Sequence, residues 1–261
     1  MLRKTVFIPI LLFFALAGNA QNDSIVEYFR NIPQLNAEPE VLDWDSFTGI
    51  TREWEEESDC GNEWRIRQVD TINKGGHKII IAYNCAGEKI YKEYDANGML
   101  IKCYGFYPER NNIVPYRVVG REWLNPYIYI EKNFYSNNMI QDKKIRTVFG
   151  FLIGKYYGYD ENGNLKKTAD TDNGYDFTAE DIVNYCIRNK IDVCTRYHNN
   201  FEKTLTNIKK TEIIGEKMWI IQYRFPVEID GYDYISIVLH LDGRTGQVFS
   251  RGACLVRGHN D

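Results

Sequence analysis

The sequence contains none of the short motifs that mark the common enzyme classes. GxSxG, HExxH, the P-loop and a GxGxxG that follows a strand are all missing, and these spacings place nucleophiles, zinc ligands or phosphate-binding amides. The six cysteines form no CxxC pair, and no histidine stands at zinc-ligand spacing from a cysteine. We therefore expect no catalytic residues, no metal and no cofactor.

A membrane-spanning run is missing as well. The apolar segment Val6–Ala17 has 12 residues, whereas a helix that crosses a bilayer needs roughly 20. Arg3 and Lys4 precede it and Gly18-Asn19-Ala20 follows it, which is the layout of a secretory signal with its cleavage site. We expect residues 1–20 to be a cleaved signal peptide and the mature protein to be secreted or periplasmic, with no integral membrane span.

Basic residues are not in excess. The chain carries 32 Lys and Arg against 36 Asp and Glu, a formal net charge of −4. Loss of residues 1–20 would remove Arg3 and Lys4 and no acidic residue, so the mature charge becomes −6. An acidic chain without a basic patch does not fit a polyanion, so nucleic acid is not expected as the partner.

Prolines are few (7) and tyrosines many (19), a composition that suits half-buried sheets better than a disordered stalk. Residues 21–62 predict a short helix, Ile25–Ile32, followed by an irregular acidic segment. Residues 63–170 then alternate with a period of two and predict an antiparallel β-hairpin region. Its candidate strands are Lys78–Tyr83, Lys89–Tyr94, Met99–Tyr104, Tyr116–Val119, Tyr127–Phe134 and Lys144–Phe151.

Two turns of the hairpin region share one pattern. Tyr94–Leu100 and Tyr159–Leu165 both read Tyr-Asp-x-Asn-Gly-x-Leu, and Asn97-Gly98 is typical of a type I′ hairpin. The pattern resembles the hairpin repeats of bacterial surface and antitoxin-like proteins, the YD and MORN-variant type. This resemblance implies a meander of short antiparallel strands.

Six cysteines in an exported chain predict disulfides. Cys85 and Cys103 would lie on strands two spacings apart, about 9–10 Å, beyond the roughly 7 Å limit between bridged Cα atoms. Cys60 is therefore the expected partner of one of them, and Cys186 can reach Cys194 only if the intervening helix ends near Asn189. The six candidates are Cys60, Cys85, Cys103, Cys186, Cys194 and Cys254.

Beyond a boundary at residues 170–176 the pattern turns helical and then returns to strands. Thr178-Ala-Glu-Asp181 predicts a capped helix that runs to about Asn189. Four strands follow, and Trp219 is expected to lie in the core because it alternates in register with Ile221 and Tyr223. The four predicted strands are Leu205–Ile214, Met218–Phe225, Tyr232–Leu241 and a short closing strand, Gln247–Phe249.

This C-terminal stretch resembles two families. Trp219-Ile-Ile-Gln-Tyr223 and Leu241-Asp-Gly-Arg-Thr-Gly-Gln-Val248 resemble the PepSY family and related cystatin-like α+β modules, over about residues 177–255. That resemblance implies a helix packed on an antiparallel sheet and a protein-binding or protease-restraining role. NTF2-like immunity proteins, which neutralise toxins, also end in a Trp-containing strand and a strand-turn-strand with a TG turn.

The chain as a whole is thus predicted to be a β-rich α+β protein. Our first hypothesis is a non-catalytic exported protein that engages a protein or peptide, with a peptidase as one candidate partner. The alternatives are a toxin-neutralising immunity protein and an uncommon hydrolase. The candidate binding face comprises the outward residues of one strand and an arginine in the turn after it: Tyr232, Tyr234, Ser236, Val238, His240 and Arg244.

Overall fold

The computed structural model describes residues 25–43, 67–68, 72–74, 76–83, 89–107, 117–193, 206–229 and 232–256 of the 261-residue chain. The chain divides into two compact units. We call Gln34–Val148 with Leu152–Thr171 the hairpin unit, and Met1–Pro33, Phe149–Phe151 and Asp172–Asp261 the C-terminal unit. The described helix at residues 25–30 therefore belongs with the end of the chain.

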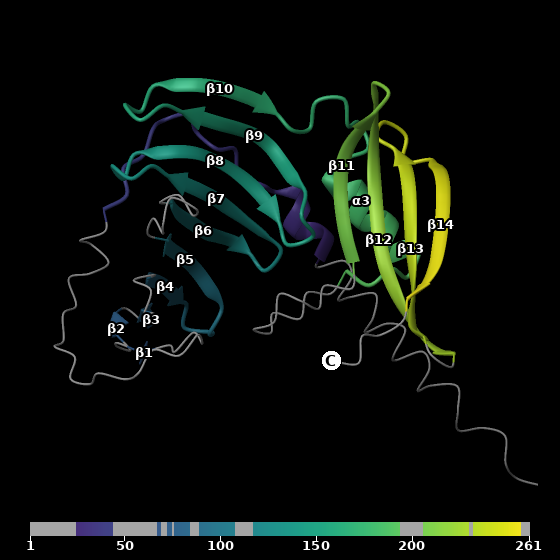
Figure 1. The fold of residues 1–261 in the computed structure, drawn as a ribbon, viewed down its shortest axis with the longest axis horizontal. Coiled ribbons are helices and arrows are strands. Elements are labelled where there is room, and N and C mark those ends of the chain that lie inside the picture. Colours follow the sequence, from purple (N-terminus) through teal and green to yellow (C-terminus); the bar gives the residue numbers. More distant parts are fainter. Residues whose placement is uncertain are drawn as a thin grey trace, which may run out of the picture. The chain divides into compact units, whose positions relative to one another are not determined.

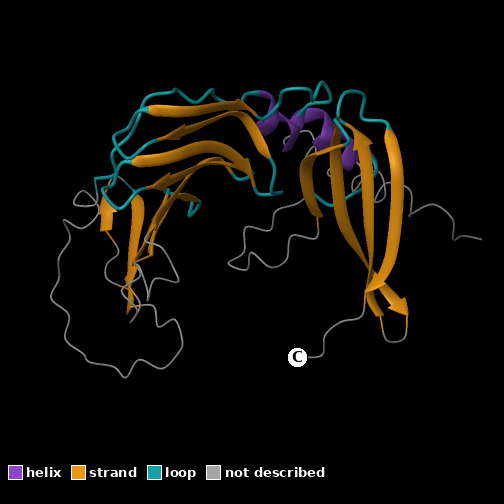
Figure 2. Cartoon of the chain, turned by 45° about the horizontal axis from the view of Figure 1, so that its top comes forward, coloured by secondary structure: helices purple, strands orange, loops and turns teal. Residues whose placement is uncertain are grey.

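Both units are built on antiparallel sheets, which confirms the β-rich prediction (Figures 1 and 2). In the hairpin unit, β3 to β10 pair in sequence order, with β1 and β2 both pairing with β3. Each strand therefore follows its neighbour through a hairpin, as a meander requires. The strands are β1 (Arg67–Gln68), β2 (Ile72–Lys74), β3 (His77–Tyr83), β4 (Lys89–Tyr94), β5 (Leu100–Tyr107), β6 (Arg117–Asn125), β7 (Ile128–Phe134), β8 (Ile140–Thr147), β9 (Leu152–Tyr159) and β10 (Leu165–Asp170).

The Asn-Gly turns are present, but the prediction of type I′ geometry is wrong. In the turn after β4, Gly98 donates to the Asp95 carbonyl at 3.0 Å and has φ +79°, while Asn97 is not among the residues with positive φ. One residue in the left-handed region after a type I turn makes a three-residue loop with a G1 bulge. Asp95 favours this form because its Oδ1 accepts from the Asn97 and Met99 amides.

The predicted strand Lys144–Phe151 is also wrong, because it spans a turn. β8 ends at Thr147 and β9 begins at Leu152. Gly150 lies between them with φ +108°, a conformation that residues with a side chain rarely adopt. The Phe149 and Phe151 side chains are both 2% exposed, so their apolar character reflects burial beside a turn and does not mark a strand.

One face of the meander carries a cluster of buried apolar side chains. Residues 34–43, which we call the strap, run along this face, and Val41 forms an isolated bridge with Met139. Leu42 of the strap is 6% exposed and packs in the cluster. The other buried members are Tyr91, Tyr104, Val118, Phe134, Ile140, Tyr157 and Tyr159.

The predicted helix of the C-terminal unit is confirmed as α3 (Ala179–Arg188), with Asn189 as its C-cap. Thr178 accepts from the Asp181 amide and Asp181 accepts from the Thr178 amide, the reciprocal arrangement of a capping box. Ile182, Val183 and Cys186 are 0% exposed. Since these positions recur every three or four residues, one stripe of α3 is buried.

Four antiparallel strands complete this unit in the order β11 (Thr206–Ile213), β12 (Glu216–Ile229), β13 (Tyr232–Asp242) and β14 (Val248–Val256). The first three confirm the predicted strands. The fourth was predicted to be a short strand, Gln247–Phe249, but it continues for nine residues. Its sequence, VFSRGACLV, has no sustained apolar alternation, so periodicity alone could not place its end.

The two sides of this sheet differ in burial. Trp219, Ile221 and Leu241 are 0% exposed, which confirms Trp219 as a core residue, and its Nε1 donates to the Phe177 carbonyl at 2.9 Å. The Phe151 and Tyr175 rings lie edge-on to the Trp219 ring at 5.0 and 5.4 Å. We call this the inner face; the alternate residues form the outer face.

Among the described residues, no helix is long and apolar enough to cross a membrane. Cys103, Cys186 and Cys254 are free thiols. Burial raises the pKa of the Cys186 thiol to about 12, so this residue behaves as a core side chain. Cys60, Cys85 and Cys194 lie outside the described residues, and the disulfides stay a prediction.

Candidate functional site

The predicted binding residues lie on β13 and the turn after it, with unequal exposure. Tyr234, Val238 and His240 are half-buried, whereas Ser236 is only 5% exposed and lies 3.5 Å from Gln222 Nε2. Ser236 therefore offers little surface to a partner. The side chain of Tyr232 is outside the described part of the chain, although its backbone pairs with Ile229.

The strand register shows which neighbours share the outer face with these residues. Arg224 pairs with Ser236, Gln222 with Val238, and Ile220 with His240, and paired residues in antiparallel strands lie on the same side of a sheet. The adjacent strands add Lys209 from β11, and Ser250, Gly252 and Cys254 from β14. The exposed residues among them are Lys209, Gln222, Arg224, Ser250, Gly252 and Cys254. Ile220 and the β13 residues are half-buried or buried.

The most ordered feature of the outer face is an arginine stacked on a tyrosine. The Arg224 guanidinium carbon lies 4.9 Å from the centroid of the Tyr234 ring, within the range of a cation–π contact. Arg224 is nevertheless exposed. Such a pair presents charge and hydrogen-bond donors beside an aromatic edge, which is typical of protein-binding surfaces.

At the centre of the outer face the charged side chains are basic, while Glu216 and Asp242 lie on the same side at one end of the sheet. Lys209 and Arg224 are basic and lie on adjacent strands, with His240 on the next strand. The paired positions between them hold no carboxylate among the described side chains. Although the protein is acidic overall, this face is therefore suited to an acidic segment.

Arg244 lies in the turn between β13 and β14, and Asp242 shapes that turn. Asp242 Oδ1 accepts from the Arg244 amide at 3.0 Å and from the Thr245 amide at 2.7 Å. The hydrogen bonds from Thr245 hold the pKa of Asp242 below its usual value. Arg244 is exposed at this end of the sheet, so its side chain is open to a partner while its backbone is fixed.

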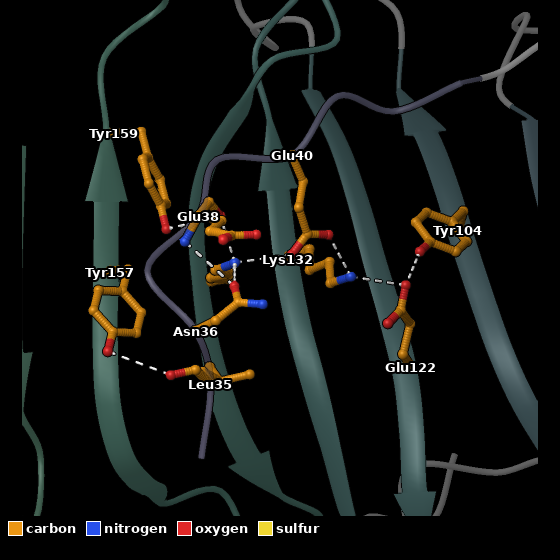
Figure 3. A network of polar contacts seen from close by, with 10 residues as sticks. Leu35, Asn36, Glu38, Glu40, Tyr104, Glu122, Lys132, Tyr157 and Tyr159 are labelled. Carbon is orange, nitrogen blue, oxygen red and sulfur yellow. Dashed lines mark hydrogen bonds and ion pairs between the residues drawn. The ribbon is translucent and has the colours of Figure 1, made fainter. Parts of the chain in front are cut away.

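A second polar cluster lies in the hairpin unit, under the strap (Figure 3). Lys143 is 1% exposed and donates to Glu40 Oε1 at 2.9 Å, Asn36 Oδ1 at 2.8 Å and the Glu38 carbonyl at 2.7 Å. These three bonds use all three donors of its ammonium group. Lys132 pairs with the other oxygen of Glu40 at 2.6 Å.

The cluster continues across the sheet from Lys132. Its Nζ also donates to Glu122 Oε1 at 2.9 Å, and Glu122 accepts from the Tyr104 hydroxyl. Two lysines thus face two glutamates, and the formal charges balance. Burial of the two lysines is possible because each is paired with a carboxylate, while Glu40 and Glu122 are half-buried.

The protonation states argue against a reactive lysine in this cluster. Burial lowers the pKa of Lys132, but hydrogen bonds from Lys132 to Glu40 and Glu122 outweigh it, and the net pKa is raised. Burial likewise raises the pKa of Glu40, but its bonds to Lys132 and Lys143 leave that pKa lowered. A nucleophilic lysine needs a depressed pKa, so Lys132 is suited to holding the strap.

Sequence reasoning missed this cluster, although one signal was present. Every second residue of a strand lies on the same face of the sheet. In β7 one such set is Ile128, Ile130, Lys132 and Phe134. A lysine among buried apolar positions requires a buried partner. The partner, Glu40, is 92 residues away in sequence, and no local pattern identifies it.

The structure describes two of the four histidines, and each lies beside a different partner. His77 belongs to the hairpin unit, where its Nδ1 lies 2.8 Å from Glu93 Oε1, and His240 belongs to the C-terminal unit, where its Nδ1 lies 2.8 Å from Ser250 Oγ. His198, His259 and Cys194 lie outside the described residues. Searches of protein-family models, of curated proteins and of solved structures find no match to this chain.

Proposed function

We propose that this is an exported, non-catalytic binding protein whose C-terminal unit engages an acidic segment of a protein or peptide. The observation that carries the proposal is the outer face of β11–β14. On this face the exposed Arg224 stacks on Tyr234. The exposed Lys209 lies on β11, two strands away from Val238 on β13. Apolar contact at the centre and basic side chains around it are what such a partner requires.

A glycine on this face supports close approach by a partner. Gly252 pairs with Val238, and a Cβ added to it would meet nothing within 4 Å. Its packing in the unit therefore does not require a glycine, while a glycine inside a strand weakens the strand. An approaching chain would reach Val238 across this position.

The PepSY-like resemblance of residues 177–255 makes a peptidase the first partner class to test. It rests on the capped helix, the Trp219 strand and the turn at Asp242. The immunity-protein alternative requires a surface that attracts a basic toxin, whereas Lys209 and Arg224 give the outer face the same sign as such a toxin. We therefore favour the first hypothesis for this face.

The test is affinity capture from the native periplasm or culture supernatant, followed by titration of each enriched partner at two salt concentrations. Charge reversal by Arg224→Glu should weaken binding at least about tenfold, and Tyr234→Ala should weaken it by removing the stacking platform. The matched control is Lys190→Glu, a reversal at an exposed residue of the same unit. Equal capture by wild type and a folded Arg224→Glu variant would refute the proposal.

A further inference from the structure

β14 is an edge strand that is exposed along almost its whole length. It pairs with β13 on one side, and no described strand pairs with its other side. Eight of its nine residues are exposed, including Phe249 at 80% and Leu255 at 46%. An edge strand with exposed apolar side chains is a ready template for another strand.

The two edges of this sheet are protected very differently. β11, the opposite edge, carries Lys209, Lys210 and Glu212 within eight residues. β14 has Arg251 as its only charged residue and contains no proline. Charged side chains, proline and bulges are usual means of preventing edge pairing. β14 has one register shift, opposite His240 and Leu241, and one charged residue, so it is the less protected edge.

The sequence of β14 is complementary to itself when reversed. About Gly252 as the centre, an antiparallel copy places Phe249 opposite Leu255 and Ser250 opposite Cys254. The first pair is apolar, the second is small and the outermost pair is valine with valine, while Arg251 lies opposite Ala253. Cross-strand pairs of matched character stabilise antiparallel sheets, and a two-fold contact must match a surface with itself.

We propose that a second copy of this chain pairs with β14 along this edge, antiparallel, with the Gly252 residues of the two copies opposite each other. The four-stranded sheet then continues into that of the second copy, and the two outer faces lie on one continuous surface. This dimer does not depend on the partner proposed above. Because one strand edge buries little area, we expect it to form in the micromolar range.

Sedimentation or light scattering of the full mature chain over a concentration series tests the proposal. Phe249→Lys alone and Leu255→Glu alone should each raise the dimer dissociation constant at least tenfold. Both changes in one chain should restore the dimer, because each introduced lysine then faces an introduced glutamate of the other copy. The control is Ile214→Lys, a residue 99% exposed in the turn between β11 and β12, which should leave the dimer unchanged.

A cross-link tests the register independently. Ser250→Cys places a thiol opposite Cys254 of the other copy, so mild oxidation with diamide should give a reducible dimer. Adding Cys254→Ser should abolish that band. A protein that stays monomeric at millimolar concentration, a dimer indifferent to both single changes, or a folded double variant that stays monomeric would each overturn the proposal. So would protection of β14 amides by a different protein bound to a monomer.

Discussion

The hairpin unit and the C-terminal unit are both antiparallel sheets, but different interactions hold them together. In the hairpin unit, β7 and β8 carry ion pairs on both faces. Lys132 and Lys143 meet Glu40 on one face, and Lys144 meets Glu131 at 3.0 Å on the other. In the C-terminal unit, the central strands β12 and β13 bury an apolar inner face around Trp219.

This difference determines which sheet face of each unit is left exposed. The strap of the hairpin unit is fixed by Glu40, Asn36 and Glu38, so the sheet face beneath it is filled by the chain itself. In the C-terminal unit α3 packs against the apolar inner face of the sheet. The polar outer face is not covered by any described element of that unit. The buried charges therefore stabilise the hairpin unit, whereas the exposed charges of the outer face are the ones that we propose to contact a partner.

The largest expected effect comes from removing the buried lysine. Lys143→Ala deletes three charge-assisted hydrogen bonds. The Glu38 carbonyl keeps only a 3.4 Å hydrogen bond from Tyr159, and Asn36 Oδ1 keeps only a 3.3 Å hydrogen bond from the Glu38 amide. We expect the hairpin unit to lose about 3 kcal/mol of unfolding free energy. Urea unfolding followed by hydrogen exchange of β7–β8 peptides measures this loss, and the β12–β13 peptides should keep their protection.

The matched control for that change is Lys167→Ala. Lys167 lies in the same unit and is exposed, so its removal should change stability by no more than about 0.5 kcal/mol. If Lys143→Ala costs no more than Lys167→Ala, the buried ion pairs contribute nothing to the hairpin unit and the contrast between the units fails.

The second-largest effect is expected from acid, which should destabilise the hairpin unit before the C-terminal unit. Hydrogen bonds from Lys132 and Lys143 outweigh burial and lower the pKa of Glu40, and Lys144 does the same for Glu131 against burial. A group with a lowered folded pKa contributes stability above its unfolded pKa, about 4.3, and that contribution is lost as pH falls through the folded pKa. We expect the hairpin unit to lose protection first below about pH 4.

Hydrogen exchange at stepped pH values measures the order of loss. The variant Glu40→Gln removes one of the carboxylates whose pKa is lowered, so it should be less stable at neutral pH and should show a shallower acid dependence in the hairpin unit. Loss of protection in β12–β13 at a higher pH than in β7–β8 would contradict the comparison.

Local sequence patterns predicted most elements of both units but not β9 or β10, and they failed where distant residues decide the structure. The capping box at Thr178 and the alternation around Trp219 were sufficient for α3, β12 and β13. The ion pair of Lys143 with Glu40 joins residues 103 apart, and no spacing rule finds it. The break at Gly150 was missed because Phe149 and Phe151 extend the apolar pattern through the turn.

A third copy of the repeat turn was missed for a different reason. At Tyr135–Met139, the Asn138 amide donates to the Tyr135 carbonyl at 3.0 Å, which matches Gly98 with Asp95 and Gly163 with Asp160. Asparagine replaces glycine here and has φ +65°. The signature Asn-Gly is absent, yet the backbone is the same, because asparagine tolerates the left-handed region better than other residues with a side chain.

The smallest effect tests this equivalence. Asn138→Gly should stabilise the hairpin unit by about 0.5 kcal/mol, because glycine adopts positive φ without the steric cost that a Cβ brings. Gly98→Asn is the reverse change at a position where an added Cβ meets nothing within 4 Å, so it should destabilise by a similar amount without crowding. Urea midpoints of the two variants measure both. Shifts of the same sign would mean that the two turns are not equivalent, and that the repeat extends only to the turns with glycine.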